Sequence, residues 1–176
     1  VVALFGDAPA PPARSIVFDD PRAPALGRRA ILPDAAASAF AGDARETYEA
    51  HRIACGVPAG GLDFAYGDAF PHEANMDLLH GVAFDKGCYV GQEVVSRMQH
   101  RGLVRKRVVR VALDGQAAPG AEIRAGGIAI CVLGGASGGH GLATVRLDRA
   151  DDARGQPMRA GAAQVTVLDR EPSGSH

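Results

Sequence analysis

The stretch Lys86-Gly87-Cys88-Tyr89-Val90-Gly91-Gln92-Glu93 (KGCYVGQE, 86–93) separates two parts of the chain that differ in pattern. It runs into VVSRMQ (94–99), which has good helix formers and no breaker before Gly102. We therefore predict that Cys88 lies just before the N-terminus of a helix. The partial positive charge of that terminus, together with Lys86, favours the thiolate form of Cys88. An equally open interpretation is that the glycines form a tight turn and Cys88 is a small buried hydrophobe.

Beyond Gly102 the sequence changes to short segments of period two that are separated by glycine-rich turns. Regularly spaced short strands with such turns are typical of a small β-sandwich or barrel. The run GGASGGHG (134–141) lacks the Lys-Ser/Thr ending of a phosphate loop and precedes a strand. We interpret it as a hairpin connection in which Gly134 and Gly135 supply positive φ. The predicted strands are 108–113, 121–124, 129–133, 142–147 and 164–168.

The first part of the chain combines short strands with one helix. We predict strands at 15–18 and 29–32, and a helix at 44–55 that Asp43 caps and Gly56 ends. Residues 59–77 show no sustained periodicity but carry several aromatic residues, which are typical of anchors on a core or of pocket walls. The chain opens on VVALF (1–5), a buried-strand pattern without an initiator methionine, so we expect an N-terminal portion to precede it.

Composition limits the class of protein. The chain has 176 residues, 47% of them hydrophobic and 22% charged, and its net charge is −1, so general nucleic-acid binding is not expected. No run of about eighteen apolar residues is present, so no membrane association is expected. Three widely spaced cysteines, Cys55, Cys88 and Cys131, suggest free thiols in a reducing compartment, and we expect a cytoplasmic location.

KGCYVGQE closely resembles the signature of the YgfZ family of folate-binding proteins, which are relatives of the glycine-cleavage T-protein. The resemblance extends into NMDLLHGVAFD (75–85), VVSRMQHRGLVRKR (94–107) and YEAHRIACGVP (48–58). It implies an α+β fold that begins with an incomplete aminomethyltransferase-like α/β portion and ends with a small C-terminal antiparallel β-barrel. The expected domains are the partial folate-binding region at 1–102, the barrel at 103–170 and a disordered tail at 171–176.

The resemblance also implies a function, namely a folate-binding accessory protein for iron–sulfur cluster assembly or repair. The implied cofactor is tetrahydrofolate or another folate, and the implied partners are iron–sulfur proteins or assembly factors. Cys88 would be the reactive group and Lys86 its electrostatic support. No permanently bound metal is expected, because three thiols are too few for a self-contained cluster, although Cys88 is a candidate transient iron ligand. The candidate folate-binding residues are Tyr89, Gln92, Glu93, Arg97 and Arg52.

Two other classes stay open. A tetrahydrofolate-dependent aminomethyltransferase is the first, but the T-protein pattern RLEAG is here RIACG (52–56), with Ala54 in place of the acidic residue. A purely structural interaction module is the second. A basic segment between the motif and the first barrel strand fits a solvated face, a folate glutamate tail, an acidic partner or, last, RNA. Its members are Arg97, His100, Arg101, Arg105, Lys106 and Arg107.

Overall fold

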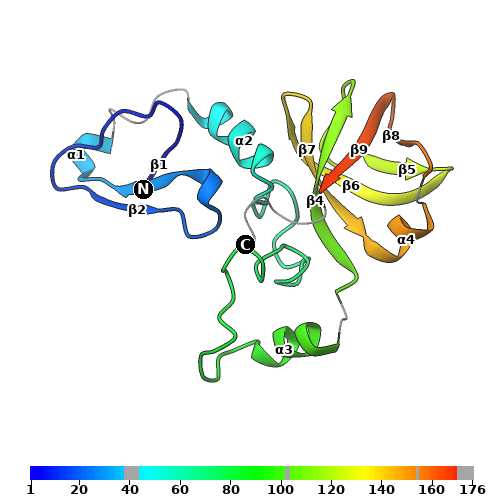
Figure 1. Ribbon diagram of the computed structural model, residues 1–176, viewed down its shortest axis with the longest axis horizontal. Coiled ribbons are helices and arrows are strands. Elements are labelled where there is room, and N and C mark those ends of the chain that lie inside the picture. The colour runs from blue at the N-terminus through cyan, green and yellow to red at the C-terminus, as the bar shows by residue number, and fades with distance from the viewer. Residues whose placement is uncertain (38–43, 102–103, 154, 170–176) are drawn as a thin grey trace.

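The computed structural model describes residues 1–37, 44–101, 104–153 and 155–169. Figure 1 shows a small N-terminal sheet, a helix that leads from it to a β-barrel, and a second helix that lies apart from both. None of the helices in the described ranges is long and apolar enough to cross a bilayer. The elements before the barrel are β1 (Val2–Leu4), β2 (Ile16–Asp19), the 3₁₀ turn η1 (Pro24–Leu26), β3 (Arg28–Ile31), α1 (Asp34–Ala37), α2 (Ala44–Ala54) and α3 (Gln92–Arg101).

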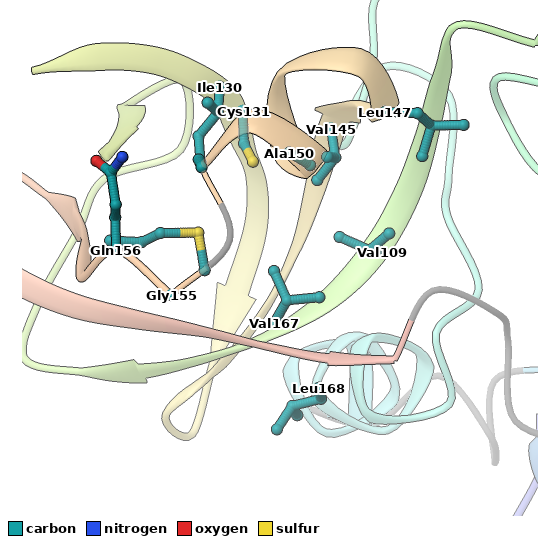
Figure 2. A pocket seen from close by; sticks show the side chains of 12 residues that line it. Val109, Ile130, Cys131, Val145, Leu147, Ala150, Gly155, Gln156, Val167 and Leu168 are labelled. Atoms are coloured by element: carbon teal, nitrogen blue, oxygen red, sulfur yellow. The ribbon is translucent and has the colours of Figure 1, made fainter. Parts of the chain in front are cut away.

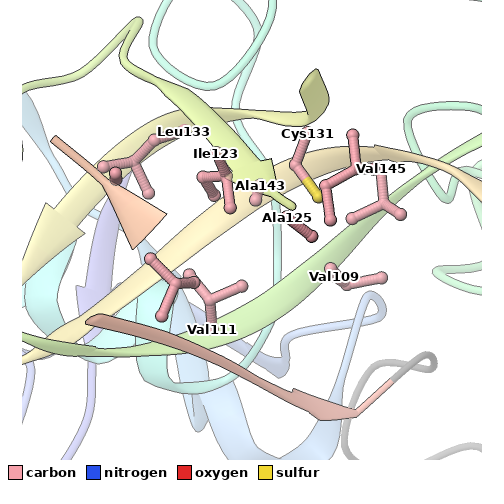
Figure 3. Packing of buried hydrophobic residues seen from close by; sticks show 11 residues of the cluster. Val109, Val111, Ile123, Ala125, Cys131, Leu133, Ala143 and Val145 are labelled. Atoms are coloured by element: carbon pink, nitrogen blue, oxygen red, sulfur yellow. The ribbon is translucent and has the colours of Figure 1, made fainter. Parts of the chain in front are cut away.

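The barrel closes in the order β4-β7-β6-β5-β8-β9, with every neighbouring pair antiparallel. Alternate residues of its strands point inward, and their aliphatic side chains fill the interior (Figure 3). The predicted α+β class with a small C-terminal barrel is therefore confirmed. Its elements are β4 (Lys106–Asp114), β5 (Glu122–Ala125), β6 (Ile128–Ser137), β7 (His140–Arg146), α4 (Leu147–Asp152), β8 (Met158–Ala160) and β9 (Ala163–Asp169).

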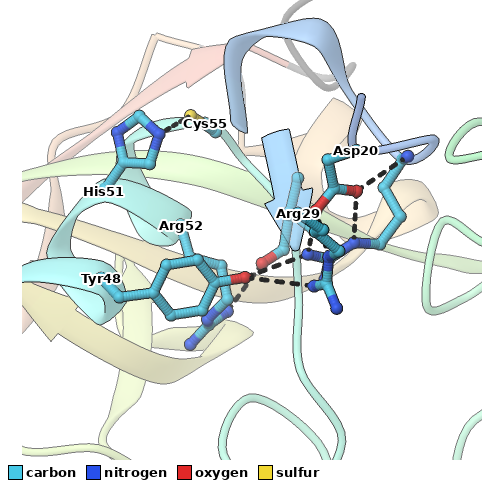
Figure 4. A network of polar contacts seen from close by, with 8 residues as sticks. Asp20, Arg29, Tyr48, His51, Arg52 and Cys55 are labelled. Carbon is cyan, nitrogen blue, oxygen red and sulfur yellow. Dashed lines mark hydrogen bonds and ion pairs between the residues drawn. The ribbon is translucent and has the colours of Figure 1, made fainter. Parts of the chain in front are cut away.

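The N-terminal sheet has the order β1-β3-β2 and is antiparallel throughout. Asp20, directly after β2, accepts hydrogen bonds from Arg22 and from Arg29 of β3, with nitrogen–oxygen distances of 2.8 and 2.7 Å. The Tyr48 hydroxyl of α2 accepts from the same two guanidinium groups (Figure 4). This network fixes α2 against the sheet.

The other end of α2 packs on the barrel. Ile53 forms a buried cluster with Val108 of β4 and Leu142 of β7. In the loop that follows α2, the Asp63 carboxylate accepts a hydrogen bond of 2.7 Å from the Gly135 backbone N–H in β6. The two halves of the chain are thus joined by both apolar and polar contacts.

Both long helices lie where the sequence predicted them, and the predicted barrel strands are present with slightly different ends. Three short elements were missed: α1 has only four residues, β8 only three, and α4 lies in an expected turn. The domain boundaries stay a prediction. Residues 102–103, the proposed cap Asp43 and the predicted disordered tail all fall outside the described residues.

The interpretation of the glycine run was wrong in one respect. Gly134 and Gly135 belong to β6 and do not have positive φ; the turn is made by Gly138 and Gly139, with φ of 58° and 77°. The two earlier glycines serve close packing instead. A Cβ at Gly134 would lie 2.8 Å from the Asp63 Cα, so a side chain there would push the loop off the barrel.

Candidate functional site

The KGCYVGQE motif forms an exposed loop that leads into α3. Gly91 has φ of 88°, a conformation that favours glycine, and helix α3 begins at the next residue, Gln92. Cys88 is exposed, which excludes the interpretation of this residue as a buried hydrophobe. The Lys86 ammonium lies 4.5 Å from the centre of the Tyr89 ring, a cation–π contact. The proposed support of a Cys88 thiolate by Lys86 stays a prediction.

A cavity of about 280 Å³ lies between α3 and the loop that precedes it. Its apolar walls are Ala83, Phe84 and Val95. Two predicted folate-binding residues, Tyr89 and Gln92, are among its polar walls. The other polar lining residues are Ser96, Gln99 and His100. The volume lies near the lower end of the range for ligand pockets, about 300–1,000 Å³. The cavity therefore has room for one ring system of a ligand.

Glu93 and Arg97 do not line this cavity. They form an ion pair with each other over one helical turn, at 2.6 Å between carboxylate and guanidinium. Their side chains are 76% and 61% exposed, so both point to solvent. The structure thus divides the predicted residues of the α3 segment between a cavity face and an outer face.

Arg52, the remaining predicted folate-binding residue, is almost fully buried in α2. Its guanidinium donates to the Asp63 carboxylate and to the Glu49 carboxylate, both at 2.6 Å, and to the Val57 carbonyl at 2.7 Å. Burial lowers the pKa of Arg52, but the two carboxylates outweigh it and raise the pKa above its usual value. Arg52 therefore connects α2 to the loop that contacts β6, through buried hydrogen bonds.

The other two cysteines are buried. Cys131 lines an apolar cavity of about 330 Å³ at one end of the barrel (Figure 2), and burial raises the pKa of its thiol to about 12. Cys55 lies 3.8 Å from the His51 ring nitrogen (Figure 4). Burial raises the pKa of Cys55 more than the charge of Arg110 lowers it. Both thiols are held in the protonated form at neutral pH.

The basic segment does not form one free surface. Arg107 in β4 makes a two-pronged ion pair with Asp77, at 2.5 and 2.7 Å, and also donates to the His72 carbonyl. Arg97 pairs with Glu93. The side chain of Arg101 lies outside the described residues. Because two of the arginines are already paired with carboxylates of this chain, the segment offers less positive charge to a ligand than its composition suggests.

Sequence reasoning missed two buried polar residues in the segment before the motif. His72 is fully buried, and its Nε2 atom lies 3.1 Å from the Gln99 Oε1 atom. Asn75, also fully buried, adopts φ of 58° and donates to the Val108 carbonyl. Asn tolerates the left-handed conformation better than most residues. The segment around them lacks periodicity, and although Asn75 opens the stretch 75–85 that carries part of the family resemblance, no pattern indicated what either side chain contacts.

The barrel matches a known class of domain. Residues 105–171 match the family described as the CAF17 C-terminal beta-barrel domain. Over a longer stretch than this barrel, the chain is similar to proteins named as mitochondrial iron–sulfur cluster assembly factors. The matched stretch covers only part of this chain and only part of each of those proteins.

The relative from Mycosarcoma maydis, an iron–sulfur cluster assembly factor IBA57 homolog, is 50% identical over 95 residues, which cover 51% of this chain and 23% of the relative. The human IBA57 protein is 38% identical over 102 residues, which cover 56% of this chain and 29% of the human protein. A Dictyostelium discoideum homolog is 36% identical over 105 residues, which cover 56% of this chain and 26% of that homolog. The chain thus spans about a quarter of the length of these relatives.

These relatives correct one prediction. All three are named as mitochondrial proteins, so the expected cytoplasmic location is wrong on this comparison. Their names agree with the role in iron–sulfur cluster assembly that the sequence resemblance implied. The names mention neither folate nor a thiol, so both stay predictions.

Proposed function

We propose that this chain is part of a mitochondrial accessory factor for iron–sulfur cluster assembly or repair, which binds folate and uses the Cys88 thiol. The observation that carries the proposal is the exposed position of Cys88 on the loop before α3. The names of the relatives support the assembly role and the location. The implied partners are iron–sulfur proteins or assembly factors that contact this loop.

The contrast among the three thiols supports Cys88 as the reactive group. Thiolates, not thiols, bind iron and attack disulfides. Cys55 and Cys131 are buried and their pKa values are raised, so neither is available to a partner. A cluster normally needs four thiolate ligands. One exposed thiol therefore acts together with ligands that a partner supplies, either by transient iron ligation or by thiol exchange.

The chemistry of the cavity beside α3 fits part of a folate. Tyr89 and Gln92 line it and would hold a bound ring, while Glu93 and Arg97 lie on the outer face of the helix. Arg52 is engaged by internal carboxylates, so the proposal gives it a structural role. Folate bound beside Cys88 would bring the cofactor and the thiol to the same loop.

Aminomethyl transfer gains no such support. The position where the T-protein pattern has an acidic residue carries the methyl group of Ala54, at the end of α2. The Ala54 carbonyl accepts a hydrogen bond of 2.8 Å from Arg110, which is a structural contact. We therefore favour the accessory role over the transferase.

Replacement of Cys88 in the intact protein tests the proposal. In cells that depend on the protein, Cys88→Ala should reduce the activity of cluster-containing enzymes to the level seen without the protein. The matched control is Cys131→Ala, which removes a buried thiol and should leave that activity unchanged. The amount and circular dichroism of each variant report on folding. Full enzyme activity with a folded Cys88→Ala protein would contradict the role of the thiol.

A further inference from the structure

We propose that the cavity beside α3 binds an uncharged planar heteroaromatic ring, and that Gln99 donates a hydrogen bond to the edge of that ring. His72 would be the positioning residue that holds the Gln99 amide. The inference rests on the proposed folate function and makes it specific: the pterin ring enters the cavity, and the glutamate tail stays outside.

The lining chemistry of the cavity favours a neutral ring over an anion. Gln92, Ser96 and Gln99 recur at spacings of four and three residues, so they share one face of α3. They contribute two amides and a hydroxyl, and the other walls add the rings of Phe84, Tyr89 and His100. No carboxylate, lysine or arginine is among the described lining residues. A flat ring with donors and acceptors on its edge matches such walls.

The His72 contact fixes the orientation of the Gln99 amide. The Gln99 Oε1 atom lies 3.1 Å from His72 Nε2, and because an amide oxygen can only accept, this contact requires the tautomer with the proton on Nε2. The other ring nitrogen, Nδ1, is buried without a hydrogen-bond partner among the described residues, which agrees with a bare lone pair there. With its oxygen engaged, Gln99 keeps its NH₂ group available as a donor. Gln99 itself is exposed and reachable from the cavity.

The barrel holds His72 in place. The Arg107 guanidinium of β4 donates to the His72 carbonyl at 2.8 Å and pairs with Asp77 in the same segment. Asn75 adds a hydrogen bond of 2.7 Å to the Val108 carbonyl. A rigid strand thus supports His72, and His72 supports the amide on α3. Such support behind a contacting residue keeps its donor in the geometry needed for binding.

Ligand fragments test the inference on the intact protein. Calorimetry would measure the binding of 5-formyltetrahydrofolate, of pterin as the ring alone and of p-aminobenzoylglutamate as the tail alone. We expect the folate and pterin to bind at the same site, and the tail fragment not to compete with them. If folate binds but the tail fragment competes and pterin does not, the inference is overturned while the folate function stands. If none of the three binds, both fail.

Variants of the two residues separate positioning from folding. Gln99→Glu keeps an oxygen for His72 but removes the NH₂ donor, so pterin affinity should fall about tenfold or more. Glu93→Gln, on the outer face of α3, is the matched control and should bind pterin normally. His72→Phe should weaken binding and shift the Gln99 side-chain amide resonances in NMR spectra. His72→Gln, which places an N–H near the same position, should restore both. Unchanged pterin affinity in Gln99→Glu, or no rescue by His72→Gln, would refute the assignment.

Discussion

At the scale of single residues, Arg52 shows how a charge in a recognisable motif can serve the scaffold. It is among the largest fully buried side chains, yet it carries a positive charge that Asp63 and Glu49 balance. The Asp63 carboxylate also accepts from the Ala59 and Gly135 backbone N–H groups at 2.7 Å. Removing the guanidinium would therefore leave a buried carboxylate without its counter-charge.

We expect Arg52→Met to lower the free energy of unfolding by about 3–5 kcal/mol, which is the usual cost of removing one partner of a buried ion pair. Urea denaturation followed by circular dichroism measures it. Arg124→Met is the matched control, because the pair of Arg124 with Glu122 is about half exposed and should cost less than about 1 kcal/mol. Equal losses in the two variants would show that the Arg52 pair is not what stabilises this region.

At the scale of elements, Asp20 connects β2, β3 and α2 through its two arginine partners. Burial alone raises the pKa of Asp20, but the hydrogen bonds from Arg22 and Arg29 outweigh it and hold the pKa well below its usual range. A carboxylate with a depressed pKa in the folded state stabilises the fold above its unfolded pKa of about 3.9. That stabilisation is lost as the pH falls further.

The free energy of unfolding should therefore decrease below about pH 4, and Asp20→Asn should both lower it at pH 7 and flatten this acid dependence. Denaturant titrations at a series of pH values measure both effects. Asp148→Asn is the control, because Asp148 also has a lowered pKa but its side chain is exposed, at 55%. If the free energy of unfolding of Asp20→Asn fell below pH 4 as steeply as that of the natural protein, the acid dependence would come from groups other than Asp20.

Sequence pattern was sufficient where an element is long and regular. It placed α2, α3 and most barrel strands, because helix formers and alternating apolar residues act locally. It placed the motif loop and Cys88 but not the partners that shape the cavity. His72 and Gln99 are 27 positions apart, and an irregular segment carries no period that would indicate their contact. The internal contacts of Arg52 were not predictable for the same reason, since its partner Asp63 lies in a loop.

At the scale of the whole molecule, the irregular segment before the motif is fixed mainly by β4. Arg107 binds Asp77 and the His72 carbonyl, and Asn75 binds the Val108 carbonyl. Because the same segment contacts α3 through His72, the barrel and the motif helix are mechanically connected.

Arg107→Leu should break this connection and leave the barrel folded. Hydrogen exchange should become faster in residues 72–79 and in α3, whereas β5, β6 and β8, which do not pair with β4, should keep their protection. Lys106→Leu, at the neighbouring position of β4, is the control and should leave residues 72–79 protected. Faster exchange throughout the barrel in Arg107→Leu would mean that the molecule unfolds as a single unit.

The N-terminal sheet has a further consequence for the protein in solution. Strand β2 pairs with β3 on one side, and among the described residues nothing pairs with its other side. All four of its residues are exposed, including Ile16 at 63% and Phe18 at 39%. An apolar strand edge of this kind is a template for pairing between molecules. In concentrated samples, aggregation would therefore start at β2, and a lysine in place of Ile16 would be the simplest way to improve solubility.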